Sequence, residues 1–298
     1  MNQPLPPTVL RKLEQALAQW RQWRGADELP GAPHLAGQLG GISNYTVMAV
    51  AAGQRFCVRL DRLNPTANGL NRQMEWRALM LAYDAGIAPR PRYFNPDIGV
   101  LVCDYLPPDD DQSVAPGDLA RLLQAIHRLP RLHYRLDLPE RLRHYRHQLG
   151  TLQPGLSNAL ETLDKAAAPL LAELLPTSGN HCLCHNDISR GNLMRSGGRL
   201  YALDWEYCAM GNPWFDLATS QLNSGLEAQR HEDLLQYYLE RTVTDSDRGL
   251  LEQWAYIARY LELLWYLSQR PDYLAPDATE EKVSGLLSDA IRFNHGSC

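Results

Sequence analysis

The most informative stretch of the chain reads His185-Asn186-Asp187-Ile188-Ser189-Arg190-Gly191-Asn192-Leu193, and it is followed by Leu203-Asp204-Trp205-Glu206-Tyr207. Each segment comes directly after an apolar run that predicts a strand. Phosphoryl transfer from a nucleotide needs a carboxylate near the attacking hydroxyl and oxygen ligands for Mg²⁺. Asp187, Asn192 and Asp204 offer these groups. Any one of them alone is more typical of a turn or a helix cap, but the ordered set favours Mg²⁺-dependent phosphoryl transfer.

The sequence on either side of these segments divides into a strand-rich part and a helical part. The expected strands cover residues 34–40, 45–51, 55–60, 92–94, 100–103, 182–184 and 200–203. The expected helices cover residues 9–23, 71–83, 116–128, 139–150, 155–175, 213–223, 227–241 and 249–269. Proline, acidic residues and serine at positions 107–113 mark a linker or exposed loop. Strands grouped apart from helices predict an α+β fold with a small antiparallel sheet lobe, residues 1–105, and a larger helical lobe, residues 106–298.

Composition narrows the classes of partner. The 298 residues carry a net charge of −5, which gives no reason to expect a nucleic acid, because phosphate binding favours a basic surface. No apolar run reaches the roughly 20 residues that span a bilayer. The residues after Met1 lack the basic and apolar segments of a secretory signal. We therefore expect a cytoplasmic protein without a membrane or nucleic-acid partner, and its oligomeric state, a homodimer included, stays open.

Three consecutive segments resemble the aminoglycoside phosphotransferase and choline kinase superfamily, whose members are relatives of protein kinases. His185, Asp187 and Asn192 match the His-x-Asp motif with Asn five residues later, and Leu203–Tyr207 matches the apolar-Asp-aromatic motif. Gly211–Ala218 resembles the Gly-x-Pro-x-x-Asp-Leu-Ala segment of that family. The resemblance runs from about residue 40 to about residue 269. It implies a protein-kinase-like fold with a nucleotide-binding N-terminal lobe and a catalytic C-terminal lobe.

The resemblance also implies roles for individual residues. Asp187 is the residue that accepts or orients the proton of the acceptor hydroxyl, and Asn192 and Asp204 bind Mg²⁺. His185 is expected to tie the catalytic loop through hydrogen bonds. Asp216 resembles the carboxylate that braces this loop from behind.

On the nucleotide side, the family places a glycine-containing turn over the phosphates and a basic residue on a later strand. Gly41 and Ser43 lie in the turn, which by itself is only a connection between strands. Arg59 stands where protein kinases carry a lysine, and Glu75 is its expected acidic partner; the alternative is an exposed ion pair of little energetic value. The resemblance assigns the hinge that holds the adenine of ATP to Asp104, Tyr105 and Leu106.

The sequence indicates the acceptor-binding residues less clearly than the nucleotide-binding residues. Aromatic residues at positions 254–269 have the spacing of a core helix, yet part of this segment resembles the helix that lines the choline pocket of choline kinases. Trp265 fits one aromatic position, where a ring attracts a cationic ammonium, whereas Glu262 stands in place of a second aromatic residue. Trp205 and Glu206, beside Asp204, complete the expected acceptor set together with Asp187.

These features favour a small, cationic alcohol as substrate, with choline or ethanolamine ahead of thiamine. Bacterial thiamine kinases resemble the chain in an Asp-Trp-Glu-Tyr run, so thiamine remains an alternative, followed by aminoglycosides or amino sugars. A nucleotide-binding pseudokinase without activity is the non-enzymatic alternative.

Cys182 and Cys184 point the same way on one expected strand, with His185 beside them. This trio could indicate zinc, but no second pair of ligands follows at the usual spacing. We therefore interpret the cysteines as buried free thiols in a reducing compartment.

Overall fold

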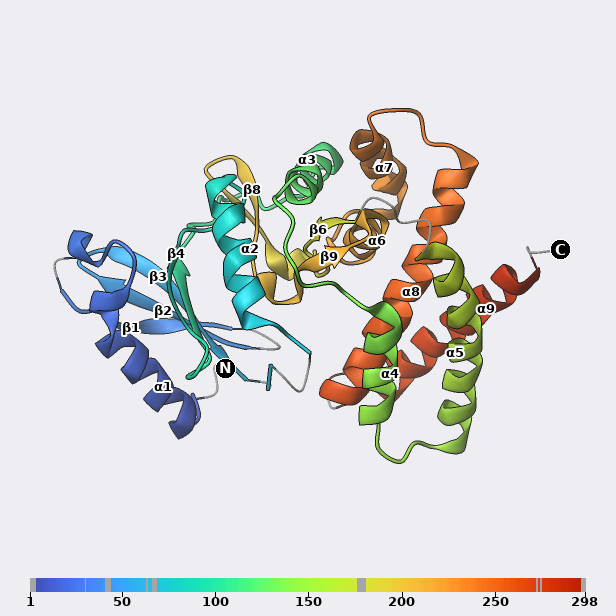
Figure 1. The fold of residues 1–298 in the computed structure, drawn as a ribbon, viewed down its shortest axis with the longest axis horizontal. Coiled ribbons are helices and arrows are strands. Elements are labelled where there is room, and N and C mark those ends of the chain that lie inside the picture. The colour runs from blue at the N-terminus through green and yellow to red at the C-terminus, as the bar shows by residue number, and fades with distance from the viewer. Residues whose placement is uncertain are drawn as a thin grey trace.

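The N-terminal strands form one antiparallel sheet with the order β1-β2-β3-β5-β4. The computed structural model describes residues 4–29, 31–40, 44–62, 64–65, 69–175, 181–271, 273 and 275–295. The bounds of the strands are β1 (His34–Gly40), β2 (Asn44–Ala51), β3 (Gln54–Asp61), β4 (Pro91–Asn95) and β5 (Val100–Asp104). In Figure 1 this sheet and helix α1 (Pro7–Ala18) make up the small lobe, and the helices of the large lobe lie beyond helix α2 (Arg72–Asp84).

Alternation along the strands decides which side chains reach the large lobe. Successive side chains of a strand point to opposite faces of the sheet. Val58 and Val102 are buried in a core cluster with α1. On the other face, Arg59 lines the cavity between the lobes and Cys103 packs in the larger core. The strand pattern therefore turns Arg59 toward the cleft.

Helix α2 belongs to the core of the large lobe as well as to the small lobe. It begins after Asn71, whose side chain accepts a hydrogen bond from the Met74 backbone N–H at 3.1 Å, which is a typical N-cap. Ala78 and Leu79 are buried in the large core cluster, while the Trp76 ring stacks on Phe94 of β4 at 5.4 Å. The helix thus connects the sheet to the rest of the molecule.

The C-terminal part is mainly helical and contains two short two-stranded sheets. Its helices are α3 (Pro116–His127), α4 (Leu138–Gln148), α5 (Pro154–Leu174), α6 (Pro213–Asn223), α7 (His231–Leu239), α8 (Asp245–Gln269) and α9 (Pro276–His295). Its strands are β6 (Cys182–Cys184), β7 (Leu193–Ser196), β8 (Arg199–Ala202) and β9 (Ala209–Gly211), with β6 paired to β9 and β7 paired to β8. The long helix α8 runs through this lobe (Figure 1). The expected two-lobed, kinase-like α+β fold is confirmed.

Several expected boundaries were wrong in detail. The first helix ends at Ala18 and is followed by a separate 3₁₀ turn at Trp20–Gln22, and helix α7 begins only at His231. The strands β7 and β9 and the last helix, α9, were not expected. A division at residue 105 remains a prediction; the chain leaves β5 at Asp104 and next forms a helix at Pro116.

Among the described residues, no helix has the length and apolar character needed to cross a membrane.

Candidate active site

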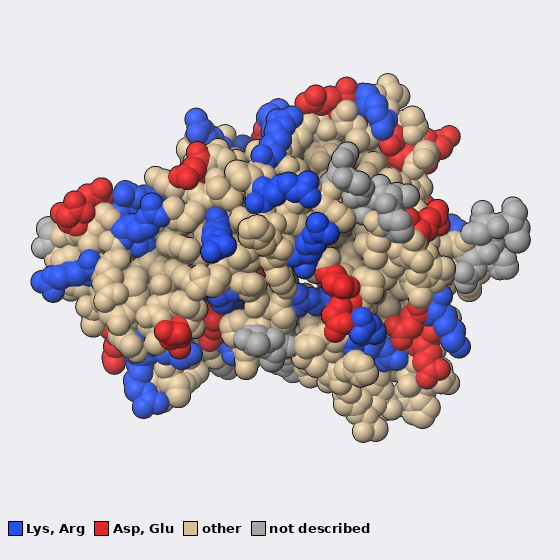
Figure 2. Space-filling view, viewed as in Figure 1, with Lys and Arg blue, Asp and Glu red and all other residues tan. Residues whose placement is uncertain are grey.

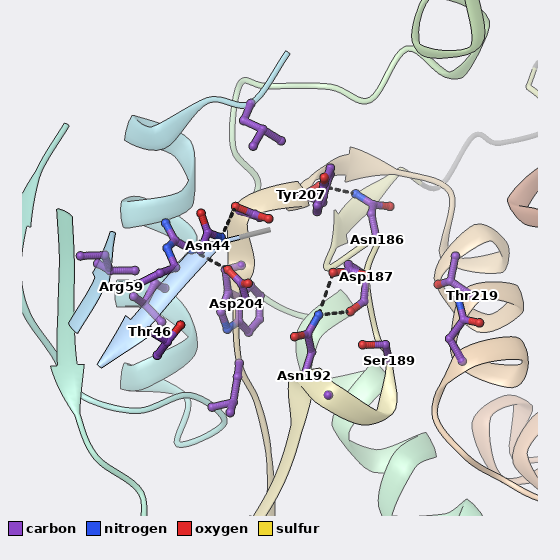
Figure 3. Close-up of a pocket in the computed structure, with 18 of the residues that line it drawn as sticks. Asn44, Thr46, Arg59, Asn186, Asp187, Ser189, Asn192, Asp204, Tyr207 and Thr219 are labelled. Atoms are coloured by element: carbon purple, nitrogen blue, oxygen red, sulfur yellow. Dashed lines mark hydrogen bonds and ion pairs between the residues drawn. The ribbon is translucent and has the colours of Figure 1, made fainter. Parts of the chain in front are cut away.

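A cavity of about 890 Å³ lies between the lobes and brings most of the predicted site residues together. Asp187, Asn192 and Asp204 line it from the large lobe, and Arg59 lines it from the sheet. Figure 3 shows these side chains converging on the same space. On the outside, basic and acidic side chains gather near the middle of the face in Figure 2, where the lobes meet. The three oxygen-bearing groups predicted from the sequence therefore share one cavity.

The catalytic loop, His185–Leu193, is held from behind by Asp216 of α6. The buried carboxylate accepts hydrogen bonds from the backbone N–H groups of His185 and Asn186 at 2.8 and 2.6 Å, and from His127 Nε2 at 3.1 Å. Burial alone would raise the pKa of Asp216, but these donors, His127 first, hold it below its usual value. Asn186 has a φ of 63°, a strained backbone that Asn tolerates better than most residues. The position of Asp216 agrees with the bracing role expected from the sequence.

His185 is buried rather than exposed to the cavity. Its Nε2 lies 2.9 Å from the backbone oxygen of Leu203, and its ring packs edge-on against Trp205 at 4.8 Å. Burial lowers the pKa of His185, so the ring is neutral. It connects the catalytic loop to the strand that leads to Asp204.

Asp187 and Asn192 are joined within the loop. Asn192 Nδ2 donates to Asp187 Oδ2 at 2.7 Å and to the backbone oxygen of Asp187 at 2.9 Å, which leaves the amide oxygen facing the side on which Asp204 lies (Figure 3). Burial and the nearby carboxylates of Asp204 and Glu206 raise the pKa of Asp187 well above its usual value. A carboxylate with a raised pKa is a stronger proton acceptor.

Asp204 follows β8 with a φ of 55°. Its Oδ1 lies 2.5 Å from Arg59 Nη1. Burial and the charge of Glu206 nevertheless raise the pKa of Asp204 to about 7, against the opposing effect of Arg59. The cleft thus holds more buried negative charge than its arginines compensate. A divalent cation fits this excess, and the carboxylate of Asp204 with the amide oxygen of Asn192 is the donor set that suits Mg²⁺.

Arg59 and Glu75 form the expected buried pair. Arg59 Nη2 donates to Glu75 Oε2 at 2.8 Å, and the side chain of Glu75 is 1% exposed. The alternative of an exposed ion pair is therefore wrong. Burial opposes both charges, but Arg59 and Arg72 hold the pKa of Glu75 below its usual value.

Two residues that sequence reasoning missed hold Glu206 against the small lobe. Arg72 Nη1 lies 3.0 Å from Glu206 Oε2, and Asn44 Nδ2 donates to the same oxygen at 2.9 Å. Arg72 also pairs with Glu75 at 2.7 Å and with Asp61 at 2.6 Å. Glu206 lines the cavity, but these partners make it a bridge between the lobes. The i, i+3 spacing of Arg72 and Glu75 was the signal that the sequence offered for this network.

The predicted hinge lies at the cavity edge, where Asp104, Tyr105 and Leu106 all contribute. The carboxylate of Asp104 is engaged by Arg92, at 2.5 and 3.1 Å. The backbone N–H groups of Asp104 and Tyr105 bond to the backbone oxygens of Arg90 and Arg55. Within the described chain no hydrogen bond is recorded for the Leu106 N–H. The predicted phosphate-turn residues Gly41 and Ser43 lie outside the described residues.

Aromatic and acidic side chains of the large lobe also line the cavity. They are Glu262, Trp265 and Tyr266 of α8, Tyr145 of α4 and Tyr207. Earlier in α8, Trp254, Tyr256 and Tyr260 are fully buried, so the helix is core in its middle and cavity wall toward its end. Trp205 is only 1% exposed and its Nε1 donates to the backbone oxygen of Ala202 at 3.1 Å, so its ring belongs mainly to the core.

The raised pKa of Asp204 predicts a specific pH dependence of stability. In the folded chain Asp204 keeps its proton up to about pH 7, whereas an unfolded Asp loses it near pH ~4. Between these pH values Asp204 binds more protons in the folded state than in the unfolded state. Its contribution to the free energy of unfolding therefore falls as the pH rises. Thermal melting without divalent cations should show a steeper fall for the wild type than for Asp204→Asn. Parallel pH profiles would contradict the assignment.

A two-lobed fold with two carboxylates and an amide in the cleft is the arrangement expected of a small-molecule phosphotransferase. Residues 34–271 match the model of the phosphotransferase enzyme family, and the chain belongs to that family. The resemblance inferred from the sequence motifs is thereby confirmed.

Comparisons with known proteins give two kinds of relative. A thiamine kinase of Escherichia coli O6:K15:H31 (strain 536 / UPEC) is 31% identical over 205 residues, which cover 67% of this chain and 69% of the relative. Among solved structures, the choline kinase LicA from Streptococcus pneumoniae superposes with a TM-score of 0.75 at 21% identity, covering 95% of this chain and 99% of that one. The ADP-bound aminoglycoside phosphotransferase APH(2'')-Ib gives a TM-score of 0.60 at 13% identity, covering 95% and 97%. The structural likenesses establish the fold.

Proposed function

We propose that the chain uses Mg²⁺ and ATP to phosphorylate the hydroxyl of a small cationic alcohol, and that thiamine is the foremost candidate. The observation that carries this proposal is the single cavity in which Asp187, Asn192 and Asp204 face an aromatic and acidic wall that includes Glu262 and Trp265. A positively charged acceptor suits that wall, because carboxylates and aromatic faces both attract cations.

The nucleotide side is supported by groups from both lobes. The Leu106 N–H can bond to the adenine edge, since the two preceding N–H groups are engaged. Arg59 reaches into the cavity, and a guanidinium can hold phosphate oxygens at two points. Mg²⁺ bound by Asn192 and Asp204 would neutralise phosphate charge. The ADP-bound relative fits this proposal.

Asp187 is the proposed base. Asn192 holds the carboxylate of Asp187 by a hydrogen bond to Oδ2 and holds the backbone of Asp187 by a second hydrogen bond. The raised pKa of Asp187 favours proton acceptance from the acceptor hydroxyl. Asp216 keeps the loop that carries Asp187 in place. All three groups required for transfer are present, which favours an active enzyme over a pseudokinase.

The choice of acceptor rests on the relatives and on the cavity wall. Sequence motifs placed choline or ethanolamine ahead, but the relatives at 31% identity are thiamine kinases, and this moves thiamine to the front. Choline is the second candidate, because Trp265 and Tyr266 both line the cavity, with ring centroids 5.0 Å apart, and aromatic faces attract an ammonium group.

A direct assay tests the proposal. Nucleotide consumption and the phosphorylated product should be measured with Mg-ATP and thiamine, choline, ethanolamine, an amino sugar and an aminoglycoside in parallel. Thiamine should give the highest kcat/KM, with choline second. Activity confined to the amino sugar or the aminoglycoside would overturn the acceptor assignment, and no turnover with any alcohol would favour the pseudokinase.

Glu262→Gln is expected to raise the KM for a cationic acceptor about fivefold, because a partly exposed ionic contact contributes roughly 1 kcal/mol. The KM for ATP should stay unchanged. Glu262 is 28% exposed and lies 3.6 Å from Lys282, so its carboxylate is not fully engaged. Glu252→Gln, the same charge change on an exposed part of α8, is the matched control. Equal KM values for the acceptor in both variants would remove Glu262 from the acceptor site.

A further inference from the structure

A cluster of metal-ligating side chains lies outside the cleft, where helix α3 meets β6 and α7 (Figure 1). One ligand atom each of His127, Cys182 and Cys184 lies within 4.8 Å of the others. The two sulfur atoms are 3.7 Å apart. Two thiolates on one tetrahedral zinc ion, with Zn–S bonds of ~2.3 Å, are separated by about 3.8 Å. The sulfurs therefore already have the spacing that a shared ion requires.

The histidine of this cluster could not be predicted from the sequence. His185, the neighbour of Cys184 in the chain, is turned to the backbone oxygen of Leu203. His127 comes instead from the end of α3, and its side chain is 7% exposed. The cluster thus depends on the packing of α3 against β6 rather than on spacing in the sequence.

One ring nitrogen of His127 already has a carboxylate partner, which leaves the other nitrogen for an ion. Its Nε2 lies 3.1 Å from Asp216 Oδ2, a carboxylate that also accepts from the backbone N–H of His185. Because the carboxylate only accepts, Nε2 carries the proton and Nδ1 presents its lone pair. Histidines that bind metals usually donate their second N–H to such a carboxylate. The Tyr238 hydroxyl, 2.7 Å from Nδ1, is the group that an ion would displace.

We propose that His127, Cys182 and Cys184 form a binding site for a thiophilic divalent cation of the zinc type, separate from the oxygen ligands in the cleft. Thiolate and imidazole select such ions over Mg²⁺. Binding releases the two thiol protons to solvent, and the two thiolates then neutralise the charge of the ion. Half-buried Cys182 gives the ion access to buried Cys184.

The site would act on the catalytic loop. Cys184 directly precedes His185, and Asp216 bonds to His127 on one side and to the backbone of His185 and Asn186 on the other. An ion held by α3 and β6 would therefore fasten the support of Asp187. This inference does not depend on the identity of the acceptor.

The test uses the reduced, chelator-treated full chain with millimolar Mg²⁺ present, so that the oxygen ligands of the cleft are occupied. Titration with Co²⁺ should produce thiolate-to-cobalt charge-transfer absorption that saturates at one ion per chain. Zn²⁺ should then abolish the absorption by displacing Co²⁺. Absence of thiolate-to-cobalt absorption in the wild type would overturn the proposal.

Substitutions of the proposed ligands and of control residues test where the ion binds. Cys182→Ser and Cys184→Ala should remove the absorption and weaken Zn²⁺ binding at least ~100-fold, the upper range for loss of a supporting partner alone. Cys208→Ser, which alters a buried thiol elsewhere, should bind as the wild type does. Tyr238→Phe removes the competing hydroxyl and should retain or tighten binding. If Cys184→Ala fails to fold, Cys182→Ser provides the test, because Cys182 is only half-buried. Unchanged cobalt binding in Cys182→Ser would exclude the site.

Discussion

Asp187→Asn is expected to lower kcat by roughly 10²–10⁴-fold, the usual contribution of a positioned general base. An amide cannot accept the proton of the acceptor hydroxyl, although it has nearly the same size as the carboxylate. Affinity for Mg-ATP should change little, because Asp187 bonds to Asn192 rather than to Arg59 or the hinge. Steady-state kinetics and calorimetric titration with a nucleotide measure the two quantities separately.

The control for this variant is Asp84→Asn, which makes the same chemical change at an exposed position at the end of α2. Its kinetics should match those of the wild type. If Asp187→Asn retained turnover within about twofold of the wild type, Asp187 would lose its proposed role.

Asp204→Ala is expected to raise the Mg²⁺ concentration required for half-maximal activity by more than about 100-fold. The variant removes a carboxylate ligand and leaves Asn192 as the remaining proposed one. Arg59 loses the contact at 2.5 Å but keeps Glu75, so the chain should still fold. Mg²⁺ titrations of activity at saturating ATP provide the measurement.

A second carboxylate of the same cavity supplies the control. Asp104→Asn changes a side chain that pairs with Arg92, and it should leave the Mg²⁺ requirement unchanged. A Mg²⁺ titration of Asp204→Ala that overlays the wild type would show that the ion is held elsewhere.

The sequence predicted those helices and strands whose ends are marked by local signals. Strand β1 and helix α6 have the expected bounds, His34–Gly40 and Pro213–Asn223, because a glycine pair that ends a strand and a proline that starts a helix are local signals. Strand β9, Ala209–Gly211, is three residues long and exists through its pairing with β6. Helix α9 buries few apolar side chains, among them Val283 and Leu286, and it was not expected.

The same distinction holds for the site. Asp187, Asn192 and Asp204 could be predicted because they share short motifs in one order. The contacts of Arg72 and Asn44 with Glu206 join residues that are 134 and 162 positions apart, and no local spacing encodes such pairs. For this reason Glu206 was interpreted as an acceptor contact, whereas the folded chain ties its carboxylate to the small lobe.

The dual packing of α2 limits how the lobes can move. Its apolar face, with Ala78 and Leu79, lies in a core cluster that includes Leu101 and Cys103 of β5 as well as residues of the large lobe, so both lobes hold the helix. Any rocking of the sheet against α2 would also strain the contact between Arg59 on β3 and Glu75 on α2. Because Arg59 also contacts Asp204, such a movement would change the position of its guanidinium relative to that carboxylate.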